Sequence, residues 1–110
     1  KKIAIPVSQE ILSPHFGHCE KFVFVSVEED KIIKMEELSS PPHQPGFLPV
    51  WLAQNGATDI ICGGIGQKAI QLFNQNSINV YYGAEPRSPK ELAEAFVNNT
   101  LDTGKNLCDH

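Results

Sequence analysis

The sequence lacks any apolar run that approaches the length of a membrane-spanning helix, so no segment predicts insertion into a membrane. It also lacks an excess of positive charge, and its formal net charge of −4 argues against nucleic acid or an anionic membrane surface as a partner. Its three cysteines are odd in number and too few for a disulfide framework. A basic start at Lys1 leads directly into a strand pattern and not into a secretory signal. We therefore expect reduced thiols in a cytoplasmic protein.

The parts of a hydrolytic active site are missing as well. A two-metal nuclease needs several carboxylates around its ions, whereas Asp59 lies at the start of its predicted strand, the wrong end. Cys19 with His15 or His43 would provide a nucleophile and a base, but no nucleophile-elbow motif accompanies them. The sequence therefore favours binding over catalysis, and we do not expect an enzyme.

A single domain is expected over residues 1–100, followed by a C-terminal tail over residues 101–110. Short apolar runs predict strands at residues 3–7, 21–27, 31–38, 58–62 and 78–82. Apolar faces at helical spacing predict helices at residues 47–55, 67–76 and 89–99. Ser88, Pro89 and Glu91 form a capping-box pattern at the start of the last helix. Pro6 has no backbone N–H, so we expect it at the end of the first strand.

These elements predict an α/β fold with one mixed sheet. Only residues 28–30 separate the second and third strands, so these two strands should form an antiparallel hairpin. Strands and helices then alternate, which implies parallel strands joined by right-handed crossovers. We expect a five-stranded sheet in the order 3-2-1-4-5, with strand 2 antiparallel and helices on both faces.

In this topology three loops emerge at one edge of the sheet. They follow the first strand at residues 8–20, the third at 39–46 and the fourth at 63–66. The first and fourth strands would be neighbours whose connections leave in opposite directions, which is where open α/β sheets bind ligands. Imidazole and thiolate side chains bind borderline and soft metals or iron–sulfur species. The imidazole and thiol side chains that would lie at this edge are those of His15, His18, Cys19, His43 and Cys62.

Among these side chains we expect His15, Cys19 and His43 to be metal ligands. No tight zinc-finger spacing is present, so the fold must assemble any site from separate loops. His18 is interpreted as a solvent-facing loop residue. Cys62 is interpreted as a core residue, because it ends a buried strand and free cysteine is among the most buried residue types.

The C-terminal tail carries two further candidate metal ligands, Cys108 and His110. Its ten residues could extend up to about 33 Å. The tail could therefore fold back to the site, reach a partner subunit or remain apart from both. The sequence leaves these three alternatives open.

A glycine turn follows the fourth predicted strand and contains Gly63, Gly64 and Gly66. Glycine lets a ligand approach the backbone closely, and the amides at the start of the next helix favour an anion. A phosphate would fit, and so would an anionic metal–sulfide or molybdate-type cluster. The turn is neither a Walker A loop nor a complete dinucleotide fingerprint, because Ala69 stands where the third glycine of the fingerprint would be.

Five short motifs, in this order, resemble the dinitrogenase iron–molybdenum cofactor-binding family of small, ribonuclease H-like α/β proteins. They cover nearly the whole chain. The motifs are IAIPV at 3–7, SPHFG at 13–17, HQPG at 43–46 with LP at 48–49 and WL at 51–52, GGIG at 63–66 with Ala69 and Phe73, and GA at 83–84.

The resemblance implies a carrier or scaffold for a metal cluster. The family includes nitrogenase accessory proteins that carry iron–molybdenum cofactor or its iron–sulfur precursor, and relatives that hold other molybdenum-containing clusters. Here the cluster would be held by His15 and its neighbours Phe16 and Gly17, with residues 63–66 as a backbone floor. Cofactor-assembly or acceptor proteins would be the partners.

Our first hypothesis is a protein that binds an iron–sulfur or molybdenum-containing cluster, or a single zinc or iron ion, at the loop edge without turning over a substrate. A second hypothesis is a phospho-ligand binder or small-molecule enzyme that uses the glycine turn. A third is an adaptor domain without a cofactor, whose sheet edge meets a protein partner. Metal content would separate the first hypothesis from the other two.

Overall fold

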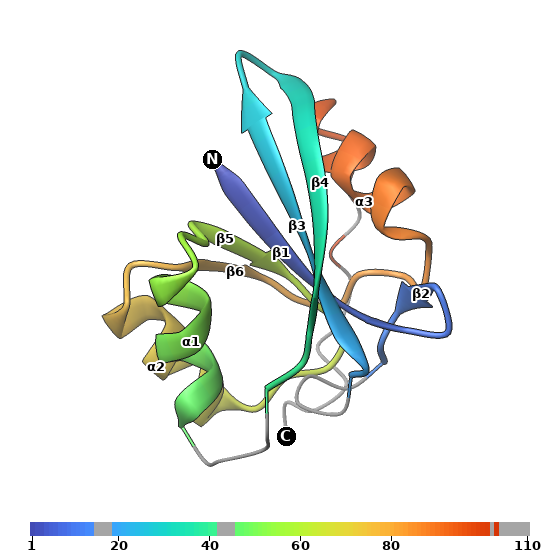
Figure 1. The fold of residues 1–110 in the computed structure, drawn as a ribbon. Helices are drawn as coiled ribbons and strands as arrows, with labels where there is room; N and C mark the ends of the chain where they lie inside the picture. The colour runs from blue at the N-terminus through green and yellow to red at the C-terminus, as the bar shows by residue number, and fades with distance from the viewer. Residues whose placement is uncertain (15–18, 42–45, 102, 104–110) are drawn as a thin grey trace.

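A computed structural model describes residues 1–14, 19–41, 46–101 and 103 of the chain. These described residues form one sheet and three helices (Figure 1). In chain order the elements are β1 (Lys2–Ser8), β2 (Ile11–Leu12), β3 (Lys21–Glu28), β4 (Lys31–Ser39), α1 (Phe47–Gln54), β5 (Asp59–Ile61), α2 (Gln67–Gln75), β6 (Asn79–Tyr81) and α3 (Pro89–Val97).

The sheet follows the order β4-β3-β1-β5-β6, and β2 pairs with β1 outside this path. As predicted, β3 is antiparallel to both of its neighbours. β5 is parallel to β1, and β6 is parallel to β5. The carboxyl ends of β1, β4, β5 and β6 therefore lie at the same edge. Over the described residues the sheet already has six strands, so the expectation of five strands was wrong.

The additional strand, β2, forms a hairpin with β1 through Gln9 and Glu10. Both residues have positive φ, at 54° and 69°, as the two-residue turns of hairpins require. Asn and Gly usually mark such turns, whereas Gln and Glu do not, so the sequence contains no signal for this hairpin. The predicted hairpin between β3 and β4 turns in the same way, at Glu29 and Asp30.

Helices cover both faces of the sheet, as predicted. α3 packs on one face, while α1 and α2 pack on the other (Figure 1). Successive residues of β1 serve the two sides, because Ile3 belongs to the core under α3 and Ala4 to the core under α1 and α2. Trp51 of α1 contacts this second core, with its ring centroid 5.6 Å from that of Phe22.

Pro6 lies inside β1 and not at its end, which corrects the expectation. Its carbonyl accepts a hydrogen bond from the Ser13 N–H at 2.9 Å. Ser13 follows β2, which pairs on the side of β1 away from β3. The N and C=O of one strand residue point to the same side, so the missing N–H of Pro6 removes no bond to β3. The parallel pairing with β5 has already ended at Ala4.

The ends of the helices agree with the predicted boundaries to within two residues. At the start of α3, the Ser88 hydroxyl accepts a hydrogen bond from the Glu91 N–H at 3.3 Å, and Pro89 occupies the first turn, so the predicted cap is present. None of the helices in the described part of the chain combines the length and apolar character needed to cross a membrane.

Candidate functional site

The loops that follow β1 (residues 9–20, which include the short strand β2), β4 and β5 are joined by backbone hydrogen bonds at one edge of the sheet. The Gly64 N–H donates to the Pro14 carbonyl at 2.8 Å, which links the loop after β5 to the loop after β1. The Ser40 N–H donates to the Glu20 carbonyl at 3.1 Å, which links the loop after β4 to that same loop. Within the residues that the structure describes, the predicted convergence of the three loops is therefore present.

Gly63 is buried where the loops meet, and its lack of a side chain is a packing requirement. A Cβ at this position would lie 2.9 Å from the Pro14 carbonyl oxygen and 3.3 Å from that of Ser13. The Gly63 carbonyl accepts a hydrogen bond from the Gly83 N–H at 2.8 Å, so a fourth loop is joined here. Gly63 and Gly64 thus hold loops together, and the Gly64 amide already has a partner within the chain.

Gly66 differs from these two glycines because it faces solvent. No described atom lies within 4 Å of the place that its Cβ would occupy. It precedes α2, whose start has no side-chain cap and no acidic residue in its first turn. Lys68, in that first turn, is exposed and makes no ion pair with the described residues. A helix start of this kind, with a lysine beside it, attracts anions.

Cys19 is half-buried at the same edge, near the end of the loop after β1 and two residues before β3. Its Sγ lies 3.9 Å from the Ser40 Oγ. Burial raises the pKa of the Cys19 thiol above its ordinary value, and the hydrogen bond with Ser40 offsets part of this rise. A thiol must lose its proton before it can bind a metal. A metal at Cys19 would therefore compete with a firmly held proton, and its affinity would increase with pH.

The raised pKa predicts slow alkylation of Cys19 at neutral pH, because only the thiolate reacts. We expect its rate with iodoacetamide to keep rising at pH values where the thiol of the urea-unfolded chain has already reached its plateau. Peptide-resolved mass spectrometry follows Cys19 separately from the other cysteines. Equal pH profiles for the folded and unfolded chains would contradict this prediction.

The remaining predicted site residues are either part of the core or outside the described residues. Cys62 is fully buried in the core under α1 and α2, as expected. In the part of the chain that the structure describes, no three His, Cys, Asp or Glu side chains are grouped so that they could hold a metal ion. Six predicted site residues lie outside the described residues and remain predictions: His15, Phe16, Gly17, His43, Cys108 and His110.

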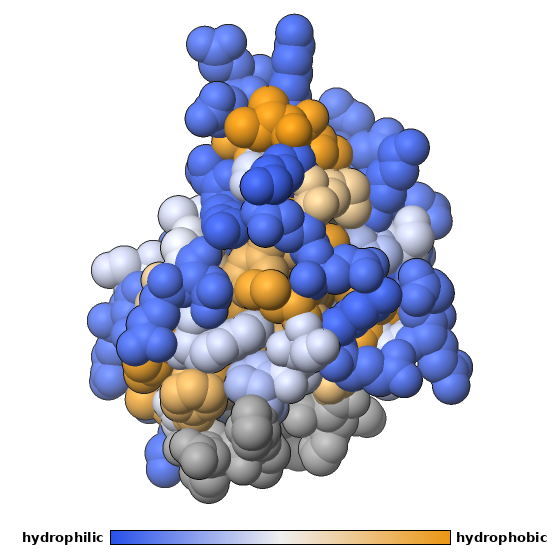
Figure 2. Space-filling view, in the orientation of Figure 1, coloured by the Kyte–Doolittle hydropathy of each residue, from blue (hydrophilic) through white to orange (hydrophobic). Residues whose placement is uncertain are grey.

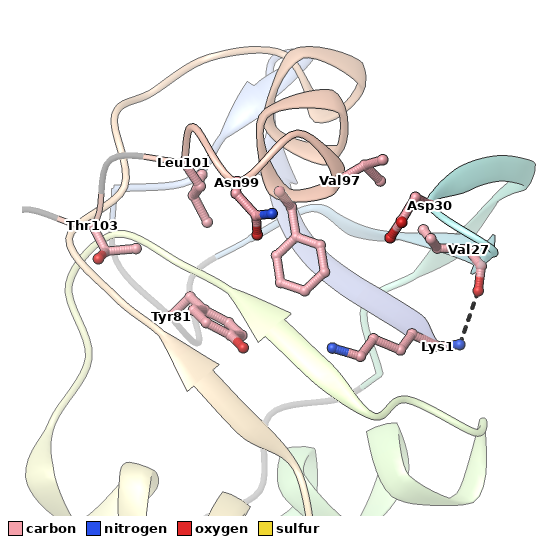
Figure 3. A pocket seen from close by; sticks show the side chains of 9 residues that line it. Lys1, Val27, Asp30, Tyr81, Val97, Asn99, Leu101 and Thr103 are labelled. Carbon is pink, nitrogen blue, oxygen red and sulfur yellow. Dashed lines mark hydrogen bonds between the residues drawn. The ribbon is translucent and has the colours of Figure 1, made fainter.

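A separate cavity of about 360 Å³ lies on the α3 face of the sheet. In Figure 3, Lys1, Asp30 and Tyr81 approach it from different strands and turns. The Tyr81 and Phe96 rings meet edge to face there, with centroids 5.2 Å apart. None of the described residues that line the cavity belongs to the predicted site. The candidate site is therefore the loop edge and not this cavity.

Comparison with known proteins identifies the group to which the chain is related. The family model described as "Dinitrogenase iron-molybdenum cofactor" matches residues 1–99. The chain belongs to this family. The sequence motifs predicted membership of this family, and the match confirms that prediction.

Relatives agree over almost the full length of the chain. The uncharacterized protein MJ0580 of Methanocaldococcus jannaschii is 37% identical over 106 residues, which are 92% of this chain and 89% of that protein. The crystal structure of PH0822 is similar with a TM-score of 0.89 and 29% identity, covering 96% of each chain. The apo form of the orange protein from Desulfovibrio gigas shares the fold, with a TM-score of 0.75, 21% identity, and coverage of 96% of this chain and 93% of that one.

Sequence reasoning missed two features of this family member's loop edge. Ser40 contacts Cys19 although 21 positions separate them, and no local pattern in the sequence indicates that contact. Lys68 was not singled out, although a lysine two residues after a glycine at a helix start is a visible sign of an anion site. Ser40 adds a partner to the Cys19 thiol, and Lys68 adds a positive charge beside the glycine turn.

Proposed function

We propose that this protein binds and carries an iron–sulfur or molybdenum-containing cluster at the loop edge, as cargo that it delivers to cofactor-assembly or acceptor proteins. The observation that carries the proposal is the junction of the three loops, which sets the Cys19 segment and the glycine turn at one edge. Membership of the dinitrogenase iron-molybdenum cofactor family supports the same kind of cargo.

The chemistry of the described residues fits an anionic cluster. Gly66 leaves open space next to the start of α2. The positive end of the helix dipole and the Lys68 ammonium favour a negatively charged group in that space. Cys19 supplies a soft sulfur ligand once it loses its proton. We propose that the remaining ligands come from the predicted set of His15, His43, Cys108 and His110.

The test is metal analysis of untagged protein that is purified without oxygen. Stoichiometric iron or molybdenum, together with sulfide-to-metal absorption in the visible range, is the expected result. Zinc as the only metal found would indicate a simple metal site and not a cluster. Absence of every metal, even after reconstitution with iron, sulfide and molybdate, would contradict the proposal.

A second candidate function, binding of a simple anion, is favoured by the uncapped start of α2. Inorganic phosphate should then raise the melting temperature of metal-free protein, by about 4–8 °C for each kcal/mol of binding free energy. Lys68→Glu should remove this rise. Lys90→Glu is the matched control, because Lys90 is also exposed in the first turn of a nine-residue helix, but one whose start is capped by Ser88. A phosphate effect that both variants retain would exclude the start of α2.

A further inference from the structure

β4 lies at the edge of the sheet and is the longest of the described strands. It spans nine residues, and β3 is its only partner among the strands of the described part of the chain. Ile33 and Met35 are 56% and 41% exposed on it. Figure 2 shows hydrophobic side chains interleaved with hydrophilic ones over the region that β4 occupies in Figure 1. An exposed edge of this kind offers unpaired backbone groups and apolar side chains to another strand.

The charges of β4 are divided along the strand, with Lys31 and Lys34 in its first half and Glu36 and Glu37 in its second half. Met35 lies opposite Val25 and shares the face covered by α3. Lys34 and Glu36 lie on the opposite face, and the Lys34 Nζ is 3.2 Å from the Glu36 Oε1. The Lys34 and Glu36 side chains are 64% and 44% exposed. Lysine on an edge strand ordinarily prevents pairing, because it would meet an apolar or positive surface. Next to a glutamate on an incoming strand, it would have the opposite effect.

On the face that carries Lys34 and Glu36, the charges are complementary to themselves in one register. Consider two copies of β4 that pair antiparallel about a two-fold axis perpendicular to the sheet. Each side chain then lies opposite a side chain on the same face only if the axis passes midway between the two copies of one residue. An axis at Lys34 or at Glu36 places like charges opposite each other. An axis at Met35 places each Lys34 opposite Glu36 of the other copy, twice, and sets the two Met35 side chains together.

We propose that β4 is the contact between two copies of this chain, paired antiparallel with Met35 on the two-fold axis. The pairing extends from Ile33 to Glu37, because the ladder between β3 and β4 shifts register next to Ile33. The two sheets then form one continuous sheet. Since the strands run in opposite directions, the loop edges of the two copies face away from each other and both stay accessible. The proposal does not depend on the proposed function.

Sedimentation of the full chain over a range of concentrations, in reducing buffer, tests this contact. The expected result is a dimer whose dissociation constant rises about tenfold or more with Lys34→Glu, and likewise with Glu36→Lys, because each change sets like charges opposite each other at two symmetric positions. The double variant Lys34→Glu with Glu36→Lys should restore dimerisation, because it exchanges the two charges. Lys31→Glu is the control on the same strand and should leave the dimer unchanged.

Two outcomes would overturn the proposal. A chain that remains monomeric up to the highest concentrations studied has no such contact. A dimer that tolerates both single reversals, or that the double variant fails to restore, uses another surface or another register. Circular dichroism verifies that each variant is folded, and these surface positions are exposed enough for the fold to tolerate them.

Discussion

Gly63→Ala is expected to lower the free energy of unfolding by about 1–3 kcal/mol. The new Cβ would lie 2.9 Å from the Pro14 carbonyl oxygen, a backbone atom that cannot move aside like the end of a flexible side chain. That carbonyl also accepts the Gly64 N–H, so the hydrogen bond between the two loops would be strained or lost. Urea unfolding followed by circular dichroism measures the change.

Gly66→Ala is the matched control in the same turn. Gly66 has φ of −78°, which alanine adopts readily, and its Cβ would meet no described atom within 4 Å. Its stability should therefore equal that of the unsubstituted chain or exceed it by up to about 1 kcal/mol, because alanine restricts the unfolded chain. If both variants lost the same stability, the steric role of Gly63 would be refuted.

The two variants also separate the loop junction from the ligand site. Gly63→Ala displaces Pro14, which directly precedes His15, so it should reduce both stability and metal retention. Gly66→Ala should reduce metal retention while leaving stability intact, because its methyl group enters the open space at the start of α2.

Replacing His15 and Cys19 together by alanine should lower the retained metal by about tenfold or more. The change removes one imidazole and one thiol from the proposed site, and loss of ligands weakens metal binding directly. Elemental analysis of anaerobically purified protein, normalised to protein concentration, gives the retained metal. Loss of the Cys19 side chain should change the melting temperature of metal-free protein little, because this side chain is only half-buried in a loop.

His18→Ala provides the control for this pair of substitutions. It removes an imidazole from the same loop segment, three positions from His15, at a residue interpreted as facing solvent. Metal retention should stay near that of the unsubstituted chain. Unchanged retention in the His15 and Cys19 double variant would reject these two residues as ligands, whatever the metal proves to be.

Much of the fold was accessible from local patterns in the sequence. Apolar runs of strand length and apolar faces of helical spacing placed three helices and five strands close to their observed positions. The spacing of Ser88, Pro89 and Glu91 predicted a cap that forms as expected. These signals are local, because the hydrogen bonds or the periodic burial that they reflect join residues close together in the chain.

The sequence also predicted which loops meet, since alternating strands and helices constrain the direction of each strand. It did not predict β2, because Gln9 and Glu10 adopt positive φ without the residues that usually mark such a turn. It placed Pro6 at the strand end and not inside β1. Whether a proline inside a strand removes a hydrogen bond depends on which neighbouring strand its nitrogen faces, and the sequence alone does not show this.

The sequence by itself therefore determined the family, the fold class and which loops meet at one edge of the sheet. Only the tertiary structure decided what each residue does at that edge. The roles of Gly63 and Gly66 look alike in a glycine-rich motif. They differ because Pro14 packs against one position and open space adjoins the other. Contacts between loops distant in the chain are fixed by the sheet that brings the loops together, and short-range sequence patterns do not record them.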